Sequence, residues 1–370
     1  MCNNEKNENQ ATSEPSTHKI KKKRILSFLG KALLIYTAFS LIIVVMCYDA
    51  MFSRTTPAKY SMRVQYDDVK AEYERDLICF ESGDNTLQGY HYGKENEKGL
   101  IVISHGLGAV AENYLSETLY FVDNGYQVFS YDNTGCHNSE GDDSRGLSQS
   151  VIDLDSALTY IESDSRFDNL PILLFGHSWG GYAVTAIFNY NHNITASVSL
   201  AGFNEPISMI FDKGKQIMGP LAYIEYPIMS LYHRFLFKGN ATLTAVDGIN
   251  QTSTPILLIH GNEDEVIDPN TVGIIAFKDE ITNPNVQYIL RTNERQNNHT
   301  QLCMSITALE YIDELNITYN ELSQKYDNEV PEEELKTFYD SIDKKKASLL
   351  NEELMQEILK FYEASLNNSN

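Results

Sequence analysis

Short continuous runs of apolar residues alternate with stretches of helical spacing over most of the chain. Six runs of four or five residues follow one another, at 100–104, 127–131, 172–175, 197–201, 256–259 and 286–290. Two earlier runs, 77–80 and 87–92, flank the turn-forming residues 82–85 and predict a hairpin. Continuous apolar runs are typical of parallel strands that helices cover on both faces. The pattern therefore predicts an α/β fold with a mostly parallel central sheet and right-handed crossovers.

One much longer apolar stretch, residues 25–48, lies near the amino terminus. It is broken mainly by Lys31 and follows the basic cluster 19–24. Its length suffices to span a bilayer, and the Lys and Arg residues before it predict a cytoplasmic tail with the remainder of the chain on the far side. A cleaved signal peptide is the alternative, but no small-x-small cleavage pattern follows. We therefore expect a retained single-pass signal anchor and an extracytoplasmic domain.

These patterns divide the chain into a cytoplasmic basic tail (1–24), a transmembrane anchor (25–48), a connector (49–76) and a globular domain (77–370). Within the domain, residues 207–253 form a predicted helical insertion that is rich in large apolar and aromatic side chains. Such a segment is expected of a lid over an apolar substrate site. The alternative is a helical insertion that packs only on the main core. After residue 304 the chain is helical and charged, and the pattern at 349–366 predicts a helix that packs across the sheet.

Composition narrows the function classes. The 51 acidic residues outnumber the 29 basic ones and give a formal net charge of -22. This charge opposes general binding to nucleic acids. The 5 cysteines contain no CxxC pair, so the sequence supports neither a disulfide framework nor a cysteine zinc site.

Residues Gly176, His177, Ser178, Trp179 and Gly180 follow the predicted strand 172–175 and precede a helix-compatible run at 182–190. The glycines allow a tight strand-to-helix turn that holds the serine hydroxyl clear of the backbone. In this placement the G-x-S-x-G pattern resembles the nucleophile turn of the α/β-hydrolase family. A Gly-rich turn with a purely structural role is the alternative.

The resemblance implies that the nucleophile is followed along the chain by an acid and then by a histidine. A serine needs a base to become nucleophilic, and the base needs a carboxylate that fixes its tautomer. Of the 9 histidines, His299 is the one that follows the acid candidates, just beyond the last predicted strand. Residues 260–267 resemble the family pattern HGxxDxxV, which assigns the acid to Asp264. The nearby Glu263, Glu265 and Asp268 are alternatives.

Acyl transfer also needs donors for the negative charge that develops on the carbonyl oxygen. Residues 104–108, with the letters SHGLG, resemble the HGxG loop of the family. By that resemblance the backbone N–H groups of Leu107 and Trp179 form the oxyanion hole. Residues 131–141 resemble the DxxGxGxS loop of lipase-like and aminopeptidase-like members, but His137 and Asn138 replace its glycine region. That departure leaves the branch of the family open.

We therefore expect a serine hydrolase of the lipase and esterase branch or of the serine aminopeptidase-like branch. It would cleave an ester or related acyl bond through an acyl-enzyme, act on a small apolar acyl substrate, and need no cofactor or metal. A peptidase that acts on short peptides is the nearest alternative. A non-catalytic, membrane-displayed binding protein on the same fold is a second one.

Overall fold

An eight-stranded sheet forms the centre of the domain. The computed structural model describes residues 17–368, so the first part of the predicted tail lies outside the described residues. The strands run in the order β1-β2-β4-β3-β5-β6-β7-β8, and β2 is antiparallel to both of its neighbours while the other pairs are parallel. Their bounds are β1 Arg75–Ser82, β2 Asn85–Tyr92, β3 Leu100–Ser104, β4 Gln127–Tyr131, β5 Ile172–His177, β6 Ile194–Leu200, β7 Ile256–Gly261 and β8 Val286–Arg291.

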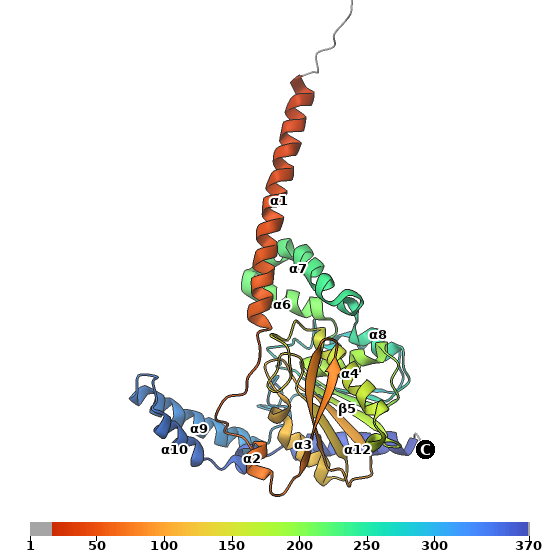
Figure 1. Cartoon of the computed structure of the whole chain (residues 1–370), viewed down its shortest axis with the longest axis vertical. Coiled ribbons are helices and arrows are strands. Elements are labelled where there is room, and N and C mark those ends of the chain that lie inside the picture. The colour runs from red at the N-terminus through yellow and green to blue at the C-terminus, as the bar shows by residue number, and fades with distance from the viewer. Residues whose placement is uncertain (1–16, 369–370) are drawn as a thin grey trace, which may run out of the picture.

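Helices cover both faces of this sheet (Figure 1). One core layer joins the sheet to α4, α5 and α8, and the other joins it to α3 and α12. Successive residues of a strand face opposite layers, as in β3, where Val102 lies in the first core and Ile103 in the second. The helix bounds are α1 Thr17–Met51, α2 Tyr66–Val69, α3 Leu115–Asp123, α4 Gln149–Ser163, α5 Trp179–Ala186, α6 Pro206–Met218, α7 Ala222–Phe237, α8 Ala245–Asn250, α9 Ile306–Lys325, α10 Glu332–Asp340, α11 Lys344–Ala347 and α12 Glu352–Asn368.

The predicted α/β class is confirmed, and each predicted apolar run corresponds to one strand. The largest difference is in β6, which begins at Ile194 because it pairs with β5 from Ile172 onward. The predicted carboxy-terminal helix is α12, and it packs across the sheet with the hydroxyl of Tyr362 donating to the carbonyl of Leu174 at 2.7 Å. Because β3, β5 and β7 are parallel, the loops that follow them meet at one edge of the sheet.

Helix α1 extends away from the domain (Figure 1). By length and composition its segment Lys21–Met51 can cross a membrane, a property that membrane anchors share with signal sequences. The chain after α1 is fastened to the 131–141 loop. There Arg54 donates to the carbonyls of His137, Ser139 and Gly141, and the backbone N–H of Thr55 donates to the carbonyl of Gly135 at 2.9 Å.

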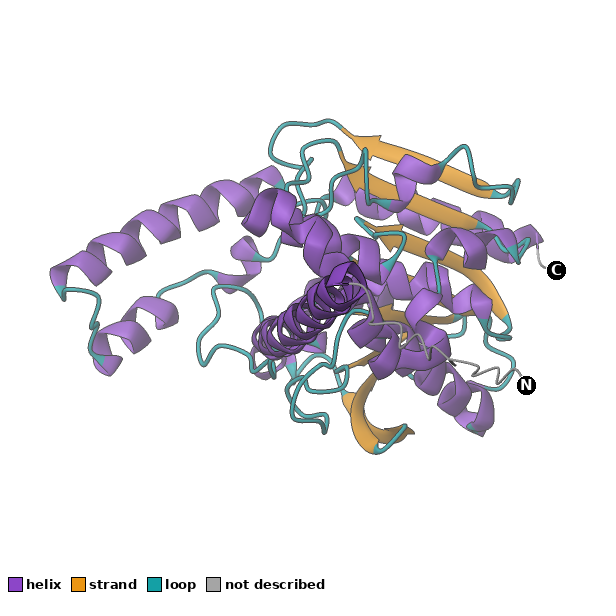
Figure 2. Cartoon of the chain, turned by 90° about the horizontal axis from the view of Figure 1, so that it is seen from above, coloured by secondary structure: helices purple, strands orange, loops and turns teal. Residues whose placement is uncertain are grey.

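A helical arm formed by α9 and α10 extends to one side of the sheet in both views (Figures 1 and 2). The connector contacts this arm, since the rings of Tyr60 and Tyr339 stack with centroids 5.0 Å apart and Lys59 pairs with Glu332. The arm belongs to the helical, charged region predicted after residue 304.

Candidate active site

Ser178 lies in a sharp turn between β5 and α5. Its φ of 58° is uncommon for a residue with a side chain, and such strain is typical of functional turns. The flanking glycines make the turn sterically feasible. A Cβ on Gly180 would lie 1.9 Å from the carbonyl oxygen of Ser104, and one on Gly176 would lie 2.2 Å from the carbonyl oxygen of Gly180. The two glycines therefore let β5, the turn and α5 approach β3 closely.

The structure brings the three predicted catalytic side chains together. His299 Nε2 lies 2.8 Å from Ser178 Oγ, and His299 Nδ1 lies 2.7 Å from Asp264 Oδ2. The three residues come from the loops after β5, β8 and β7, and both His299 and Asp264 are buried. The arrangement can move a proton from the serine hydroxyl to the imidazole while the carboxylate fixes the ring.

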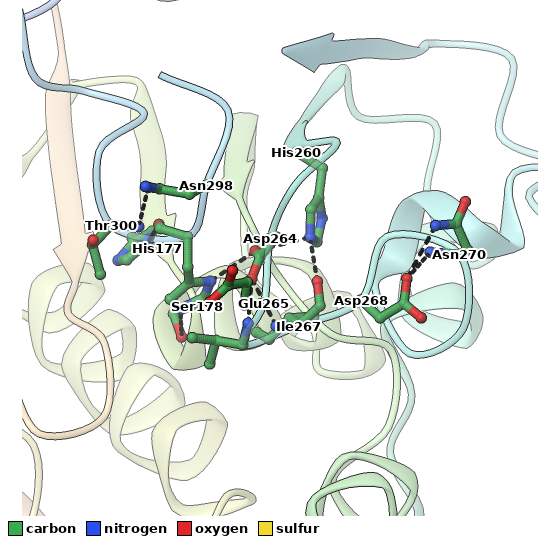
Figure 3. Close-up of polar contacts among 12 residues, drawn as sticks. His177, Ser178, His260, Asp264, Glu265, Ile267, Asp268, Asn270, Asn298 and Thr300 are labelled. Atoms are coloured by element: carbon green, nitrogen blue, oxygen red, sulfur yellow. Dashed lines mark hydrogen bonds and ion pairs between the residues drawn. The ribbon is translucent and has the colours of Figure 1, made fainter. Parts of the chain in front are cut away.

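Asp264 is held by donors on both oxygens (Figure 3). Its Oδ1 accepts from the backbone N–H groups of Val266 and Ile267 at 2.9 and 2.8 Å. Burial by itself would raise the pKa of Asp264, but hydrogen bonds from His260 and His299 hold that pKa well below its usual range. The carboxylate is therefore charged at neutral pH and can favour a protonated Nδ1 on His299.

The alternative acids of this loop lie differently. Asp268 accepts from the backbone N–H of Asn270 at 2.9 Å (Figure 3). It also accepts from the hydroxyl of Thr271 at 3.0 Å, which closes a local turn. Glu263 and Glu265 have exposed side chains. The geometry therefore favours Asp264 over its three neighbours.

His260 is a second histidine beside Asp264 that the sequence analysis gave no role. Its Nε2 lies 2.9 Å from the carbonyl oxygen of Ile267 and 3.1 Å from Asp264 Oδ2. Because a carbonyl only accepts, the proton of His260 is on Nε2 and points toward both oxygens. The His-Gly pair at a strand end is visible in the sequence, but its contact with the acid is not.

Tyr114 and His177 link the loop of Gly106 to the loop of His299. His177 Nε2 donates to the carbonyl oxygen of His299 at 2.8 Å, so its Nδ1 accepts from the hydroxyl of Tyr114 at 2.7 Å. The same hydroxyl accepts from the backbone N–H of Gly106 at 3.1 Å. Burial lowers the pKa of His177 to about 4, which keeps its ring neutral at pH 7 and preserves this pattern.

Replacing Tyr114 with phenylalanine is expected to destabilise the protein and to slow reaction at Ser178. The change leaves the N–H of Gly106 and Nδ1 of His177 without their partner, at a cost of about 1–3 kcal/mol. Thermal denaturation in detergent and the rate of covalent labelling of Ser178 would measure the two effects. Tyr120→Phe is the matched control, because that hydroxyl contacts exposed side chains of α12. Unchanged stability and labelling in Tyr114→Phe would contradict the positioning role.

Leu107 and Trp179, the residues predicted to form the oxyanion hole, lie in the two segments that follow β3 and β5. Leu107 lines the same cavity as Ser178. Trp179 is the first residue of α5, where a backbone N–H has no partner within the helix. The Trp179 indole is buried and donates to the carbonyl of Leu147 at 2.7 Å, which fixes the start of the helix.

A cavity of about 220 Å³ opens beside Ser178 and His299. Apolar side chains from several segments form much of its wall, including Leu107, Phe175, Leu302 and Met304. The residues that line it all lie outside 207–253, so the predicted lid segment does not contribute to its wall. Among the described residues, no three His, Cys, Asp or Glu side chains are grouped so that they could hold a metal ion.

Glu117 and Arg63 add a polar part to this wall. The carboxyl of Glu117 is buried, and burial raises its pKa although Arg63, 4.0 Å away, partly offsets the effect. Arg63 belongs to the connector after α1, so a segment far from Ser178 in the sequence completes the cavity.

Comparison with known proteins agrees with this architecture. The family model described as "Serine aminopeptidase, S33" matches residues 95–235, a segment that contains Ser178 and ends before Asp264. The esterase Pf2001 of Pyrococcus furiosus superposes with a TM-score of 0.51 over 74% of this chain and 98% of its own, at 17% identity. Est1E of Butyrivibrio proteoclasticus, solved with ferulic acid, covers 60% of this chain and 90% of its own at 17% identity and a TM-score of 0.47.

No curated protein is significantly similar to this sequence. At 17% identity the likeness to Pf2001 shows the fold alone. The order of the strands is that of the fold predicted from the sequence, and the family match covers the segment that carries the serine turn. This chain therefore has the α/β-hydrolase fold, and its residues 95–235 match the serine aminopeptidase family model.

Proposed function

We propose that this protein is a serine hydrolase in which Ser178 is the nucleophile, His299 the general base and Asp264 the acid that orients it. The observation that carries the proposal is the unbroken pair of contacts through His299, at 2.8 Å to Ser178 Oγ and 2.7 Å to Asp264 Oδ2. The positive φ of Ser178 supports the same reading, because it presents the hydroxyl at the edge of the sheet.

In the proposed reaction, Ser178 Oγ attacks the acyl carbonyl carbon as its proton passes to His299 Nε2. His299 then gives this proton to the leaving oxygen, and the acyl group stays on Ser178. Water releases it by the same steps, with its proton again taken by His299. The backbone N–H groups of Leu107 and Trp179 stabilise the oxyanion in both halves of the reaction.

An ester with a short apolar acyl group is the substrate class that the cavity supports best. Its volume of about 220 Å³ is below the roughly 300–1,000 Å³ of pockets that hold drug-sized ligands. Its apolar wall favours an alkyl or small aryl chain over a charged one. A peptidase that acts on short peptides is the second candidate, favoured by the description of the matching family model.

Covalent labelling with a fluorophosphonate probe tests the nucleophile. We expect the full-length protein in detergent to be labelled and the Ser178→Ala variant to lose the label completely. Ser150→Ala is the matched control, since that buried hydroxyl donates to the carbonyl of Trp179 behind the turn. A folded wild-type protein that fails to react would instead favour a binding protein on a hydrolase fold.

Hydrolysis of nitrophenyl esters beside aminoacyl nitroanilides tests the substrate class. We expect acetate and butyrate esters to be cleaved faster than dodecanoate, because the small cavity excludes long chains. Faster cleavage of the anilides would support the peptidase alternative and overturn the ester preference.

We further propose that α1 is a retained anchor and that the catalytic domain is extracytoplasmic. The support is the basic cluster before the apolar stretch and the absence of a small-x-small pattern after it. Protease added to intact cells should remove the domain and spare the tail. Protection of the domain would mean the reverse orientation, and a free domain in the medium would mean cleavage.

A further inference from the structure

A helical hairpin beside α1 carries most of the strongly exposed apolar side chains of the domain. It consists of α6, the short turn η4 (Gly219–Leu221) and α7, and we call it the α6–α7 hairpin. Outside α1, eight large apolar side chains of the described residues are more than half exposed, and six of them lie here: Ile217, Leu221, Tyr223, Ile224, Leu231 and Phe235. The inner face of the hairpin packs on the domain through Ile210 and Met229, so the exposed residues form a second, outer face.

The hairpin lies along α1 (Figures 1 and 2). Near the start of α7, the hydroxyl of Tyr36 donates to the carbonyl of Ile224 at 3.1 Å. Near its end, the hydroxyl of Tyr48 lies 3.2 Å from His233 Nδ1. Twelve residues of α1 separate these two contacts, which corresponds to a rise of about 18 Å. The two helices therefore run in the same direction and stay in contact over that length.

The part of α1 that precedes these contacts is too short to cross a bilayer by itself. The basic cluster ends at Arg24, which leaves the eleven residues 25–35, with Lys31 among them, before the first contact. Their length is about 17 Å, and the hydrocarbon core of a bilayer is about 30 Å thick. If α1 crosses a membrane, about nine further residues, from Tyr36 to about Val44, must also lie in the hydrocarbon. The start of α7, which contacts Tyr36, must then lie there too.

The charges of the hairpin are placed as this position requires. Between Lys215 and Arg234, Glu225 is the one Asp, Glu, Lys or Arg residue. Its two oxygens accept from α1, one from the hydroxyl of Tyr36 at 3.2 Å and the other from the hydroxyl of Ser40. An ionisable group within a membrane needs such partners, because lipid offers none. Both hydrogen-bond partners of Glu225 therefore lie on α1, which would enter the bilayer together with α7.

Basic residues flank the apolar stretch on both sides. Lys213 and Lys215 precede it, and Arg234 and Lys238 follow it. Residues 206–238 thus hold four basic residues and two acidic ones, although the whole chain has a net charge of -22. Long basic side chains at the edges of an inserted segment can extend to the lipid headgroups. The hairpin is therefore locally basic in an acidic chain, which favours a lipid surface as its partner.

We propose that the α6–α7 hairpin inserts beside α1 into the leaflet nearest the domain, with lipid acyl chains covering its exposed apolar face. The proposal rests on the membrane anchoring by α1 proposed above. It makes the hairpin and α1 one membrane-embedded unit that holds the catalytic domain directly against the bilayer surface.

Quenching of introduced tryptophans by lipids with brominated acyl chains tests the insertion. The chain has a single tryptophan, Trp179, which is buried in the domain and gives a constant background. Full-length variants are reconstituted in phosphatidylcholine vesicles with and without bromine, and fluorophosphonate labelling checks their folding. We expect Leu221→Trp in the hairpin to lose as much fluorescence as Leu34→Trp in α1. Leu77→Trp should lose little fluorescence, because Leu77 is 64% exposed and lies on β1, away from the hairpin.

The outcomes separate the two proposals. Strong quenching of Leu34→Trp without quenching of Leu221→Trp would overturn the hairpin insertion and leave the anchor intact. Absence of quenching at both positions would overturn the anchor and the hairpin insertion with it. Equal quenching of Leu77→Trp and Leu221→Trp would mean non-specific adsorption of the domain and would also overturn the proposal.

Discussion

Replacing His299 with alanine is expected to lower kcat for ester hydrolysis by about 10⁵- to 10⁶-fold. The ring is within 2.8 Å of Ser178 Oγ, and its removal leaves the serine proton without a base. Steady-state hydrolysis of nitrophenyl acetate by full-length protein in detergent would measure the loss. His192→Ala is the matched control, because His192 bonds Asp155 and Glu162 and does not line the cavity. A folded His299→Ala protein that keeps kcat within tenfold would contradict the proposed mechanism.

Asp264→Asn tests the other hydrogen bond of His299, and we expect a loss of about 10⁴-fold in kcat. An asparagine amide would place an N–H toward His299 Nδ1 and favour the wrong tautomer. The depressed pKa of Asp264 means that protonation does not mask the effect at neutral pH. Glu265→Gln removes an exposed carboxylate from the same loop and should leave kcat unchanged. A larger loss from Glu265→Gln than from Asp264→Asn would reassign the acid.

Gly180→Ala is expected to give the largest loss of stability for a single added methyl group. The new Cβ would lie 1.9 Å from the carbonyl oxygen of Ser104 and 3.0 Å from that of His105. The start of α5 and β3 are both packed in the core and cannot separate without disturbing it. We therefore expect the free energy of unfolding to fall by at least about 3 kcal/mol. That cost corresponds to a fall of roughly 6–12 °C in the midpoint of thermal unfolding. The variant should also lose fluorophosphonate labelling, because the turn carries Ser178.

Gly239→Ala provides the control for backbone effects. A Cβ at that position meets no atom within 4 Å, and the glycine does not require a positive φ. Its thermal midpoint should stay close to that of the wild type. A Gly180→Ala protein that unfolds at the wild-type temperature and still reacts with the probe would show that the turn tolerates a side chain. The close approach of α5 to β3 would then not explain the glycine.

The strands could be predicted because burial on both faces leaves a strong local signal. Runs such as 100–104 and 127–131 coincide with β3 and β4, since every residue of these strands is buried. The start of β6 was predicted three residues too late, because Ile194 and Ala196 acquire their strand conformation by pairing with Ile172 and Leu173 of β5. Pairing of this kind depends on distant parts of the chain and leaves a weaker local pattern.

The candidate site was only partly visible in the sequence. The order of Ser178, Asp264 and His299 follows from motifs at strand ends, and their catalytic roles stay predictions that the mutations above test. Nothing near Tyr114 in the sequence indicates its hydrogen bond to His177, 63 residues later. The division of the chain into tail, anchor, connector and lid also stays a prediction. Residues 207–253 are helical over α6, α7 and α8, but they lie outside the wall of the cavity.

The sequence by itself determined the types of element, the fold class and the candidate chemistry, because apolar spacing and strand-end motifs act over a few residues. The tertiary structure alone decided that Ser178 Oγ meets His299 across 121 positions, and that Glu225 of α7 meets Tyr36 of α1 across 189. Such contacts depend on how parallel strands align their loops at one edge and on how helices pack. Both are set by the whole core at once, since each strand is held in register by neighbours that are distant in the sequence.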